Sequence, residues 1–395
     1  MKKIVAAILL LILGIAAFYL YSISKDRIGD LRPAFLPNSK NLADEISKGQ
    51  RVGEKPSIPL TIPDGFTIGV FARDTTGARD LQFTEGGTLI ATLMSRGEVI
   101  ALPDKNNDGN SDEIKVLLSG LKRPHGLAFY NGKLFVAEEN KVSRYNFNET
   151  TVTTAFEKKL FDLPTGGRHY SRSLTFDTKG NLYVSLGSTC DTCIEKNEFI
   201  STVLISDSDG NTPRVFSKGL RNAVFLAVKP GTDEVWTTEM GRDFLGDETP
   251  PDEINILSDG GNYGWPFCYG QGIVDKTQKE PTSTFCSSSK KPYYEIPAHS
   301  APLGLTFIQS SQMDESIQGD LLVAYHGSWN RSTPTGYKIV KISTNGIPRE
   351  EDFITGFIQG SNASGRPVDV EFDKAGSLYI SDDKAGAVYK MIKTP

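Results

Sequence analysis

Short apolar segments recur along the chain in pairs. Each pair is an apolar-x-apolar segment, a turn rich in Gly, Asp or Asn, and a second apolar segment. The six pairs are residues 81–83 with 88–90, 127–129 with 133–136, 174–176 with 181–184, 226–228 with 234–236, 305–307 with 320–323, and 370–372 with 377–380. Alternation with a period of two between turn residues is typical of β-hairpins.

The spacing of these hairpins predicts the architecture. The second strands begin near Leu89, Leu134, Leu182, Val235, Leu321 and Leu378, at intervals of 45, 48, 53, 86 and 57 residues. One unit therefore carries a long insertion, near residues 245–300. Six such units predict an all-β fold, a six-bladed β-propeller over residues 56–395. A β-sandwich, the alternative, rarely repeats its hairpins at this period.

The N-terminus has a different pattern. Lys2 and Lys3 precede an apolar stretch over residues 4–23, which is long enough to cross a bilayer as a helix. No clear cleavage site follows, so residues 1–23 are predicted to be a transmembrane signal anchor, with a cleaved signal peptide or a buried helix as alternatives. The leading positive charges favour an extracytoplasmic domain, periplasmic or at the cell surface. Residues 24–55 are interpreted as a linker.

Composition and charge narrow the function classes. The 395 residues are 38% hydrophobic and 23% charged, which excludes a disordered chain and a disulfide-stapled miniprotein. A net charge of −5 provides no basic field for nucleic acid.

The four cysteines are consistent with export. Cys190 and Cys193 form a C-x-x-C, and Cys268 and Cys286 lie 18 residues apart. Zinc would need a second close pair or nearby His, which this spacing does not supply. Two structural disulfides, 190–193 and 268–286, are predicted, with a redox-active C-x-x-C as the alternative.

Arg and His gather at one point of the repeat. They stand just before the first strand of each unit: Arg79, Arg123 and His125, His169 and Arg172, Arg221 and Asn222, His299, and Arg366. In a propeller the first strands surround the central channel, so these residues are expected to converge at one end of it. Such a cluster suits a multiply anionic small molecule, with His free to act as a base.

Several motifs come in the order found in a known family. They are Gly-Gly-Arg-His-Tyr-Ser-Arg (166–172), Gly-Leu-Arg-Asn (219–222), Thr-Glu-Met-Gly-Arg-Asp (238–243), Asp-Glu-Ile-Asn (252–255), Gly-Gly-Asn-Tyr-Gly-Trp-Pro (260–266) and Gly-Arg-Pro-Val-Asp (365–369). Over about residues 60–395 the chain resembles the glucose/sorbosone dehydrogenase family. Its members are soluble quinoprotein sugar dehydrogenases that use pyrroloquinoline quinone (PQQ) on a six-bladed propeller.

The resemblance implies roles for particular residues. The catalytic base of the family falls on His169, whose neighbouring Arg charges are expected to keep it neutral. The cofactor-binding pair falls on Arg221 and Asn222, and a further cofactor Arg on Arg366. PQQ has three carboxylates, and an Arg guanidinium group can bind a carboxylate through two parallel hydrogen bonds. Arg172, in the same cluster as His169, is also predicted to bind the cofactor.

The resemblance also implies a calcium ion at the cofactor. The family holds it partly by backbone carbonyls, here those of Gly241 and Arg242, although Arg242 stands where the family has Pro. The family's cofactor Lys has no clear match, and His326 and Arg331 are the candidates. Insertions around the sugar pocket also differ from those of the glucose enzymes.

A second calcium signal does not depend on the family. Residues 104–113 match the start of an oxygen-ligand calcium loop, with Asp104, Asn106, Asp108 and Asp112 as the candidate ligands. An ordinary acidic hairpin loop is the alternative.

The leading functional hypothesis is a membrane-anchored PQQ aldose dehydrogenase. It would oxidise a sugar at C1 to the lactone with Ca²⁺ at the cofactor and pass electrons to an external acceptor. Two alternatives stay open: a metal-dependent lactonase on the same scaffold, and a non-catalytic propeller that binds a partner or glycan.

Overall fold

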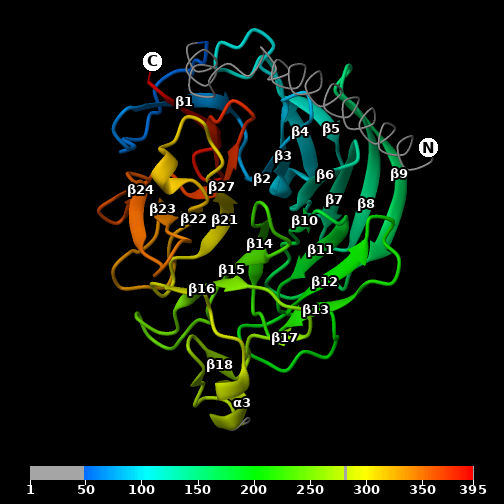
Figure 1. The fold of residues 1–395 in the computed structure, drawn as a ribbon, viewed down its shortest axis with the longest axis vertical. Helices are drawn as coiled ribbons and strands as arrows, with labels where there is room; N and C mark the ends of the chain where they lie inside the picture. Colours follow the sequence, from blue (N-terminus) through cyan, green and yellow to red (C-terminus); the bar gives the residue numbers. More distant parts are fainter. Residues whose placement is uncertain (1–48, 280–282, 395) are drawn as a thin grey trace, which may run out of the picture. The chain divides into compact units, whose positions relative to one another are not determined.

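A computed structural model describes residues 49–279 and 283–394, and in this part of the chain six β-sheets form a ring (Figure 1). The first strands of the sheets contact one another in the order β2, β6, β10, β14, β21 and β27, and β27 contacts β2. The predicted six-bladed propeller is therefore confirmed. All six predicted hairpins form the first two strands of a blade.

The first three blades follow the chain order. Blade 1 contains β2 (Ala78–Phe83), β3 (Leu89–Leu93), β4 (Glu98–Leu102) and β5 (Lys115–Leu118). Blade 2 contains β6 (Leu127–Tyr130), β7 (Lys133–Glu138), β8 (Lys141–Asn148) and β9 (Thr153–Asp162). Blade 3 contains β10 (Leu174–Phe176), β11 (Asn181–Leu186), β12 (Thr202–Asp207) and β13 (Arg214–Lys218), with the short β17 (Gly261–Asn262) added in parallel.

The last three blades complete the ring. Blade 4 contains β14 (Ala223–Val228), β15 (Val235–Glu239), β16 (Asp252–Ile256) and β20 (Tyr294–Ile296). Blade 5 contains β21 (Pro302–Phe307), β22 (Leu321–Tyr325), β23 (Lys338–Ile342) and β24 (Glu350–Ile354). Blade 6 contains β27 (Pro367–Phe372), β28 (Leu378–Asp382), β29 (Ala387–Lys393) and, as its outer strand, β1 (Phe66–Arg73).

The ring closes through this outer strand. β1 pairs with β29 in an antiparallel register, so the first and last strands of the described chain share one sheet (Figure 1). The described residues that precede β1, from Gly49, also belong to this compact unit, and the Glu54 carbonyl accepts the Val70 amide at 2.7 Å.

The hydrophobic core is divided between the blades. Six apolar clusters occur in the described residues, each between two neighbouring blades. In β7, Leu134 and Val136 pack toward blade 1, whereas Phe135 and Ala137 pack toward blade 3. Successive side chains of a strand point to opposite faces, and both faces of a blade are covered. This explains why the inner strands are apolar at nearly every position.

The long insertion lies in blade 4, between β16 and β20. It contains β17, a small hairpin of β18 (Cys268–Tyr269) and β19 (Ile273–Val274), and α3 (Ser283–Ser288). The Cys268–Cys286 disulfide joins the hairpin to α3, and the Cys190–Cys193 disulfide closes a turn after β11. Both predicted disulfides are therefore confirmed.

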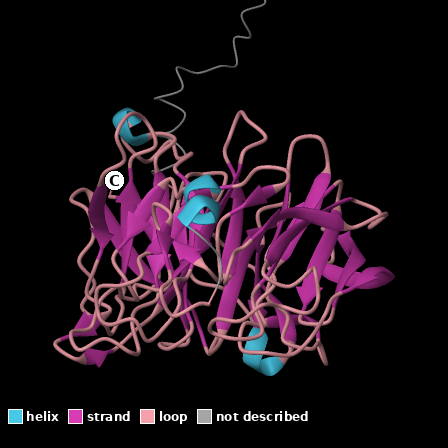
Figure 2. Ribbon diagram, turned by 90° about the horizontal axis from the view of Figure 1, so that it is seen from below, coloured by secondary structure: helices cyan, strands magenta, loops and turns pink. Residues whose placement is uncertain are grey.

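Helical structure is scarce in the described part of the chain (Figure 2). Besides α3 there are two short turns, η1 (Met94–Arg96) and η2 (Glu315–Ile317), and a second small hairpin of β25 (Ile358–Gln359) and β26 (Asn362–Ala363). Within residues 49–279 and 283–394, no helix is long and apolar enough to cross a membrane. The predicted anchor over residues 4–23 lies outside the described residues.

Polar side chains join the blades near the central channel. Asp369 Oδ2 accepts the Leu81 amide at 2.8 Å, and Asp80 Oδ2 accepts the Leu127 amide at 3.1 Å. With Glu371 they line a cavity of about 190 Å³. Burial raises the pKa of all three carboxyl groups, that of Asp369 to about 7.

These raised pKa values predict a pH-dependent stability. An acid whose pKa is higher in the folded than in the unfolded protein stabilises the fold at low pH, and this contribution is lost as pH rises through its folded pKa. We expect Asp369→Asn, whose amide oxygen can still accept the Leu81 N–H, to reduce the loss of stability between pH 4 and pH 8 by roughly 1–3 kcal/mol. Thermal unfolding of both proteins at several pH values checks this. Identical pH slopes would show that Asp369 is ionised in the fold.

Candidate functional site

A cavity of about 350 Å³ lies where the segments before β10, β14, β21 and β27 meet. Six of the side chains and backbone groups that line it were predicted from the sequence: His169, Arg221, Gly241, His299, His326 and Arg366. They come from blades 3 to 6, so the expected convergence of strand starts is observed for these blades.

His169 is fixed at one ring nitrogen. Its Nδ1 lies 3.0 Å from the Ser188 carbonyl oxygen and 2.9 Å from Ser188 Oγ. A carbonyl oxygen only accepts hydrogen bonds, so in the neutral ring Nδ1 carries the proton and donates to it. The lone pair is then on Nε2, which has no hydrogen-bond partner among the described residues.

The surroundings keep this imidazole neutral. Burial, together with the smaller effects of the nearby Arg221 and Arg168, lowers the pKa of His169 to about 3. The shift has the direction expected from the sequence, with burial rather than the arginines as its largest cause. A neutral ring with a free Nε2 is able to accept a proton from a bound hydroxyl group.

Arg221 is almost completely buried and makes strong contacts. Its Nη2 lies 2.8 Å from Asp191 Oδ1 and 3.1 Å from Asp243 Oδ2, and its Nε donates to the Asp191 carbonyl at 3.1 Å. Among the residues that the structure describes, Nη1 has only a long contact of 3.4 Å, to the Met240 carbonyl. This nitrogen is the one best placed to bind an additional anion.

Arg366 and His326 lie together on the other side of the cavity. Arg366 Nε donates to the His326 carbonyl at 3.0 Å. His326 Nε2 is 2.9 Å from Asp383 Oδ1, and Asp383 also pairs with Arg79 at 3.1 Å. Burial lowers the pKa of His326 to about 4 even though Asp383 opposes the shift. Arg79 therefore neutralises Asp383 and leaves the charge of Arg366 available to the cavity.

Asn222 lies beside His169 at a close approach of the chain. A Cβ atom on Gly187 would be 2.5 Å from both Asn222 Oδ1 and the His169 Cβ, so only glycine fits there. Asn222 Oδ1 is buried without a hydrogen-bond partner in the described part of the chain. Such an orphaned acceptor is typical of a position that a ligand or an ordered water completes.

Three predicted residues lie elsewhere. His125 is fully buried, and its ring packs 4.9 Å from that of Phe225, so it belongs to the core. Arg172 is fully buried and donates to the carbonyls of His169, Ser171 and Pro164, which makes it a support of the His169 segment. Arg331 donates to the Ala298 carbonyl and pairs with Glu248 beside the cavity.

The predicted calcium segment follows β15. Gly241 lines the cavity, and its amide donates to Asp252 Oδ1 at 2.8 Å. The Arg242 side chain turns toward Asp275, with Nη1 2.7 Å from Asp275 Oδ2. Its Nε donates to the Asp243 carbonyl at 3.1 Å, so the side chain contacts that carbonyl rather than those of Gly241 and Arg242.

Glu239, two residues before Gly241, provides a test of whether a cation fits here. Its Oε1 accepts the amides of Arg221 and Asn222, whereas Oε2 is buried and has no hydrogen-bond partner among the described residues. Burial raises the pKa of this carboxyl well above its ordinary value. An oxygen-ligated cation would satisfy the orphaned oxygen, so the residues around Gly241 fit Ca²⁺.

The acidic loop over residues 104–113 uses its side chains differently. Asp104 accepts the amides of Asp108 and Gly109, Asp108 Oδ1 accepts that of Asn110, and Asp112 Oδ2 accepts that of Lys105. Asn106 bonds Asp108. In residues 49–279 and 283–394, no three acidic side chains of this loop lie close enough together to share an ion. The second calcium stays a prediction.

Several site residues were not predicted from the sequence. Asp191, Ser188 and Asp243 bind the predicted Arg221 and His169 directly. Asn330 donates to Asp243, and its Oδ1 is buried without a partner in the described residues. Asp191 lies inside the C-x-x-C, which was interpreted only as a disulfide, and Asp243 lies inside one of the family motifs.

Comparison with known proteins decides the family. Residues 60–394 match the TrAA12-like family. The chain belongs to this family. A Borreliella burgdorferi protein of uncharacterised function is 27% identical over 371 residues, 88% of this chain and 94% of its own. A PQQ-dependent pyranose dehydrogenase of Coprinopsis cinerea is 23% identical over 85% of this chain and 55% of its own, and a PQQ-dependent sugar dehydrogenase of Hypocrea jecorina is 23% identical over 82% and 87%.

Solved structures show the same fold. The Trichoderma reesei family AA12 structure has a TM-score of 0.74 at 22% identity and covers 85% of this chain and 98% of its own. The PQQ-bound aldose sugar dehydrogenase of Streptomyces coelicolor has a TM-score of 0.60 at 16% identity, over 84% and 99%. The predicted membership of a group of PQQ-dependent sugar dehydrogenases, oxidoreductases that act on CH–OH groups, is confirmed.

Proposed function

We propose that this protein oxidises an aldose at C1 to the lactone with PQQ as its bound cofactor. The observation that carries the proposal is one cavity in which His169 offers a free Nε2 while Arg221 and Arg366 approach from different blades. The family membership and the PQQ-dependent relatives support the same assignment.

The residues present fit PQQ and calcium. Arg221 Nη1 and the Arg366 guanidinium would bind PQQ carboxylates, and the orphaned Asn222 Oδ1 would accept a hydrogen bond from the cofactor or its water. Gly241, Arg242 and Glu239 would hold the calcium ion. When bound, PQQ polarised by Ca²⁺ would supply the acceptor for the hydride of C1.

His169 performs the proton transfer. Its Nε2 takes the proton of the anomeric hydroxyl as the C1–H bond breaks and the C1=O bond of the lactone forms. The Ser188 carbonyl holds Nδ1–H and so fixes both the tautomer and the direction of the lone pair. The two electrons leave later, to an external acceptor.

Two exposed aromatic rings flank the cavity. Trp329 lines it, and Phe244 contacts Trp329 in an edge-to-face arrangement at 6.3 Å. Both are more than half exposed. We propose that the sugar approaches along these rings, because the C–H face of a pyranose packs well on an aromatic surface.

The two alternatives have less support. A metal-dependent lactonase needs carboxylates that converge on a channel metal. Asp80, Asp369 and Glu371 line one cavity, but among the described residues they are not a group close enough to share an ion, and Asp80 and Asp369 accept backbone amides between blades. A non-catalytic binding module gives no reason for a buried His with one fixed nitrogen beside two arginines.

The test is turnover by the full chain loaded with PQQ and Ca²⁺. We expect a panel of aldoses to reduce an artificial dye, with a lactone as the product. Because the C1–H bond breaks in the reaction, an aldose deuterated at C1 should react more slowly than its protonated form. An oxidation product other than the lactone would place the chemistry at another carbon, and no reduction by any aldose would contradict the proposal.

We also propose that the domain is exported and held at the membrane by residues 4–23. The two disulfides support an oxidising compartment. Cell fractionation with N-terminal peptide mapping should find the mature protein in membranes with Met1 still attached. A soluble protein that begins after residue 20 would show that the segment is a cleaved signal.

A further inference from the structure

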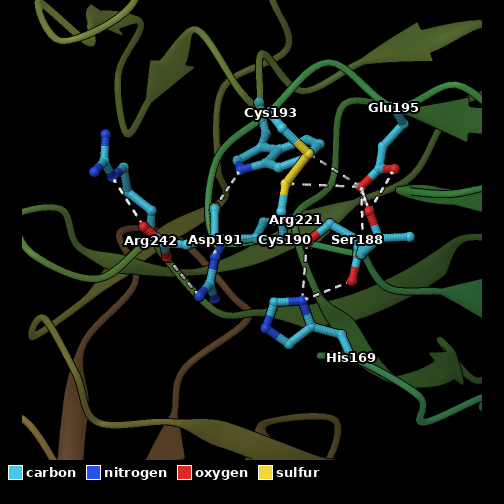
Figure 3. Close-up of a disulfide and its surroundings, with 10 residues drawn as sticks. His169, Ser188, Cys190, Asp191, Cys193, Glu195, Arg221 and Arg242 are labelled. Carbon is cyan, nitrogen blue, oxygen red and sulfur yellow. Dashed lines mark hydrogen bonds and ion pairs between the residues drawn. A yellow bond between two sulfur atoms is a disulfide. The ribbon is translucent and has the colours of Figure 1, made fainter. Parts of the chain in front are cut away.

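The turn closed by the Cys190–Cys193 disulfide lies directly behind the proposed site. It belongs to the segment 188–195, which follows β11 (Figure 3). The ends of this segment are tied together, because Thr189 donates from its amide at 2.7 Å and from its hydroxyl at 2.9–3.1 Å to the Glu195 carboxylate. The disulfide thus encloses Asp191 and Thr192 in a constrained turn.

Asp191 fixes the Arg221 side chain at two of its nitrogens. Its Oδ1 pairs with Nη2 at 2.8 Å, and its carbonyl accepts Nε at 3.1 Å. Oδ1 also accepts the Asp243 amide at 2.8 Å, and the carbonyl also accepts Trp265 Nε1 at 3.2 Å. Asp191 is therefore itself held on several sides, and its position sets the orientation of the Arg221 guanidinium group.

The same turn fixes His169. Ser188 Oγ donates to the Cys190 carbonyl at 2.6 Å, and this bond sets the Ser188 rotamer. The Ser188 carbonyl and hydroxyl are the two groups that contact His169 Nδ1 (Figure 3). One disulfide-closed turn therefore supports both the proposed base and a proposed cofactor ligand.

We propose that this turn is a positioning element whose disulfide makes cofactor binding sensitive to thiol reductants. The inference rests on the proposed function, because it takes Arg221 as a PQQ ligand. Without the disulfide, Asp191 and Cys190 gain conformational freedom. The Arg221 and Ser188 contacts must then be ordered when the cofactor binds, which costs affinity.

A dithiol supplies the two electrons and two protons that reduction of the Cys190–Cys193 disulfide requires. A thiolate of the reductant attacks one sulfur of the 190–193 pair, the S–S bond breaks and a mixed disulfide forms. The second thiol of the reductant displaces the protein sulfur. Two electrons and two protons have then passed to the protein, which holds two thiols, and the reductant leaves as a cyclic disulfide. Both cysteines are partly exposed, so a small dithiol can reach them.

The test compares the two disulfides of the chain. PQQ is titrated in the presence of Ca²⁺ into the full-length wild type, into the Cys190→Ser/Cys193→Ser variant and into the Cys268→Ser/Cys286→Ser variant. We expect the first pair to raise the Kd of PQQ about tenfold, and the second to lower the melting temperature while Kd changes less than twofold. Wild type that is reduced with dithiothreitol and freed of it under anaerobic conditions before the titration should show a raised Kd, reversibly on reoxidation, whereas the 190/193 variant treated in the same way should be unchanged.

Variants of Asp191 separate positioning from charge. Asp191→Ala removes the acceptor that orients Arg221 and should weaken PQQ about tenfold, whereas Asp191→Asn keeps an acceptor oxygen and should bind within about threefold of wild type. If the carboxylate only competed with the cofactor for Arg221, both changes would tighten binding. In an Arg221→Ala background, Asp191→Ala should have no further effect on Kd.

The outcomes distinguish the inference from the proposed function. A wild type that binds no PQQ contradicts the proposed function and, with it, this inference. A wild type that binds PQQ as tightly as the Cys190→Ser/Cys193→Ser and Asp191→Ala variants leaves the proposed function standing and overturns the positioning role. Equal weakening by the removal of either disulfide would also overturn it.

Discussion

His169→Asn is expected to lower turnover by about 10²–10⁴-fold while the affinity for PQQ stays close to that of the wild type. The loss is the usual contribution of a positioned base. Affinity should be kept because Arg221 and Arg366, rather than His169, bind the cofactor carboxylates. The assay is dye reduction at saturating aldose beside a PQQ titration for each variant.

Two other histidines serve as comparisons for this prediction. His299 also lines the cavity, but its Nε2 is already engaged 2.8 Å from the Gly246 carbonyl, so His299→Asn should cost less turnover. His125 lies in the core away from the cavity, and His125→Leu should leave turnover unchanged. Full activity of His169→Asn together with an inactive His299→Asn would assign the base to blade 5.

The pH profile provides a second check on His169. Its pKa is lowered to about 3, so the neutral imidazole persists when pH falls from 8 to 5. Turnover should therefore show no loss with a midpoint near 6.5, the ordinary value for His. The effect of His169 on the pH dependence of folding stability is opposite in sign to that of Asp369. The unfolded chain takes up the proton first, so this group lowers stability as pH falls below about 6.5.

Replacing Arg221 or Arg366 by Ala is expected to weaken PQQ binding by roughly 1.5–3 kcal/mol, about 10- to 150-fold in Kd. Arg221 and Arg366 start different blades and line the same cavity. Each substitution therefore removes a separate charge-assisted contact with the cofactor. The measurement is a titration of the Ca²⁺-loaded protein with PQQ, followed by tryptophan fluorescence.

Arg331→Ala is the matched control for this pair. Arg331 is engaged by the Ala298 carbonyl and Glu248 outside the cavity lining, so its removal should change the Kd of PQQ by less than about threefold. If Arg331→Ala weakens PQQ binding strongly while Arg221→Ala and Arg366→Ala leave it unchanged, PQQ binds near Arg331, beside the cavity, and not at Arg221 and Arg366.

The inner strands could be predicted because each pair shows the complete hairpin pattern of two apolar segments joined by a turn. Segments such as 133–136 and 378–380 are apolar on both faces, since neighbouring blades cover both. Outer strands have a weaker pattern. In β9, charged residues interrupt the apolar ones, and every position is exposed or only partly buried. The closure by β1 could not be predicted, because its partner β29 lies at the other end of the chain.

The site could be predicted only in part, for a similar reason. Strand-start positions and the family motifs correctly brought His169, Arg221 and Arg366 to one cavity. Position before a strand does not determine which way a side chain points, and Arg172 and His125 turn into the protein instead. Asp191 was missed because its role depends on a contact with Arg221, 30 residues away in sequence.

The most direct test of the central claim is a spectral titration of the full chain with PQQ and Ca²⁺, followed by addition of an aldose. We predict a saturable quinone absorption band at one PQQ per chain that requires Ca²⁺ and changes to the spectrum of the reduced cofactor when the sugar is added. A wild-type chain that shows no saturable band at micromolar PQQ, or a bound quinone that no aldose reduces, would contradict the account.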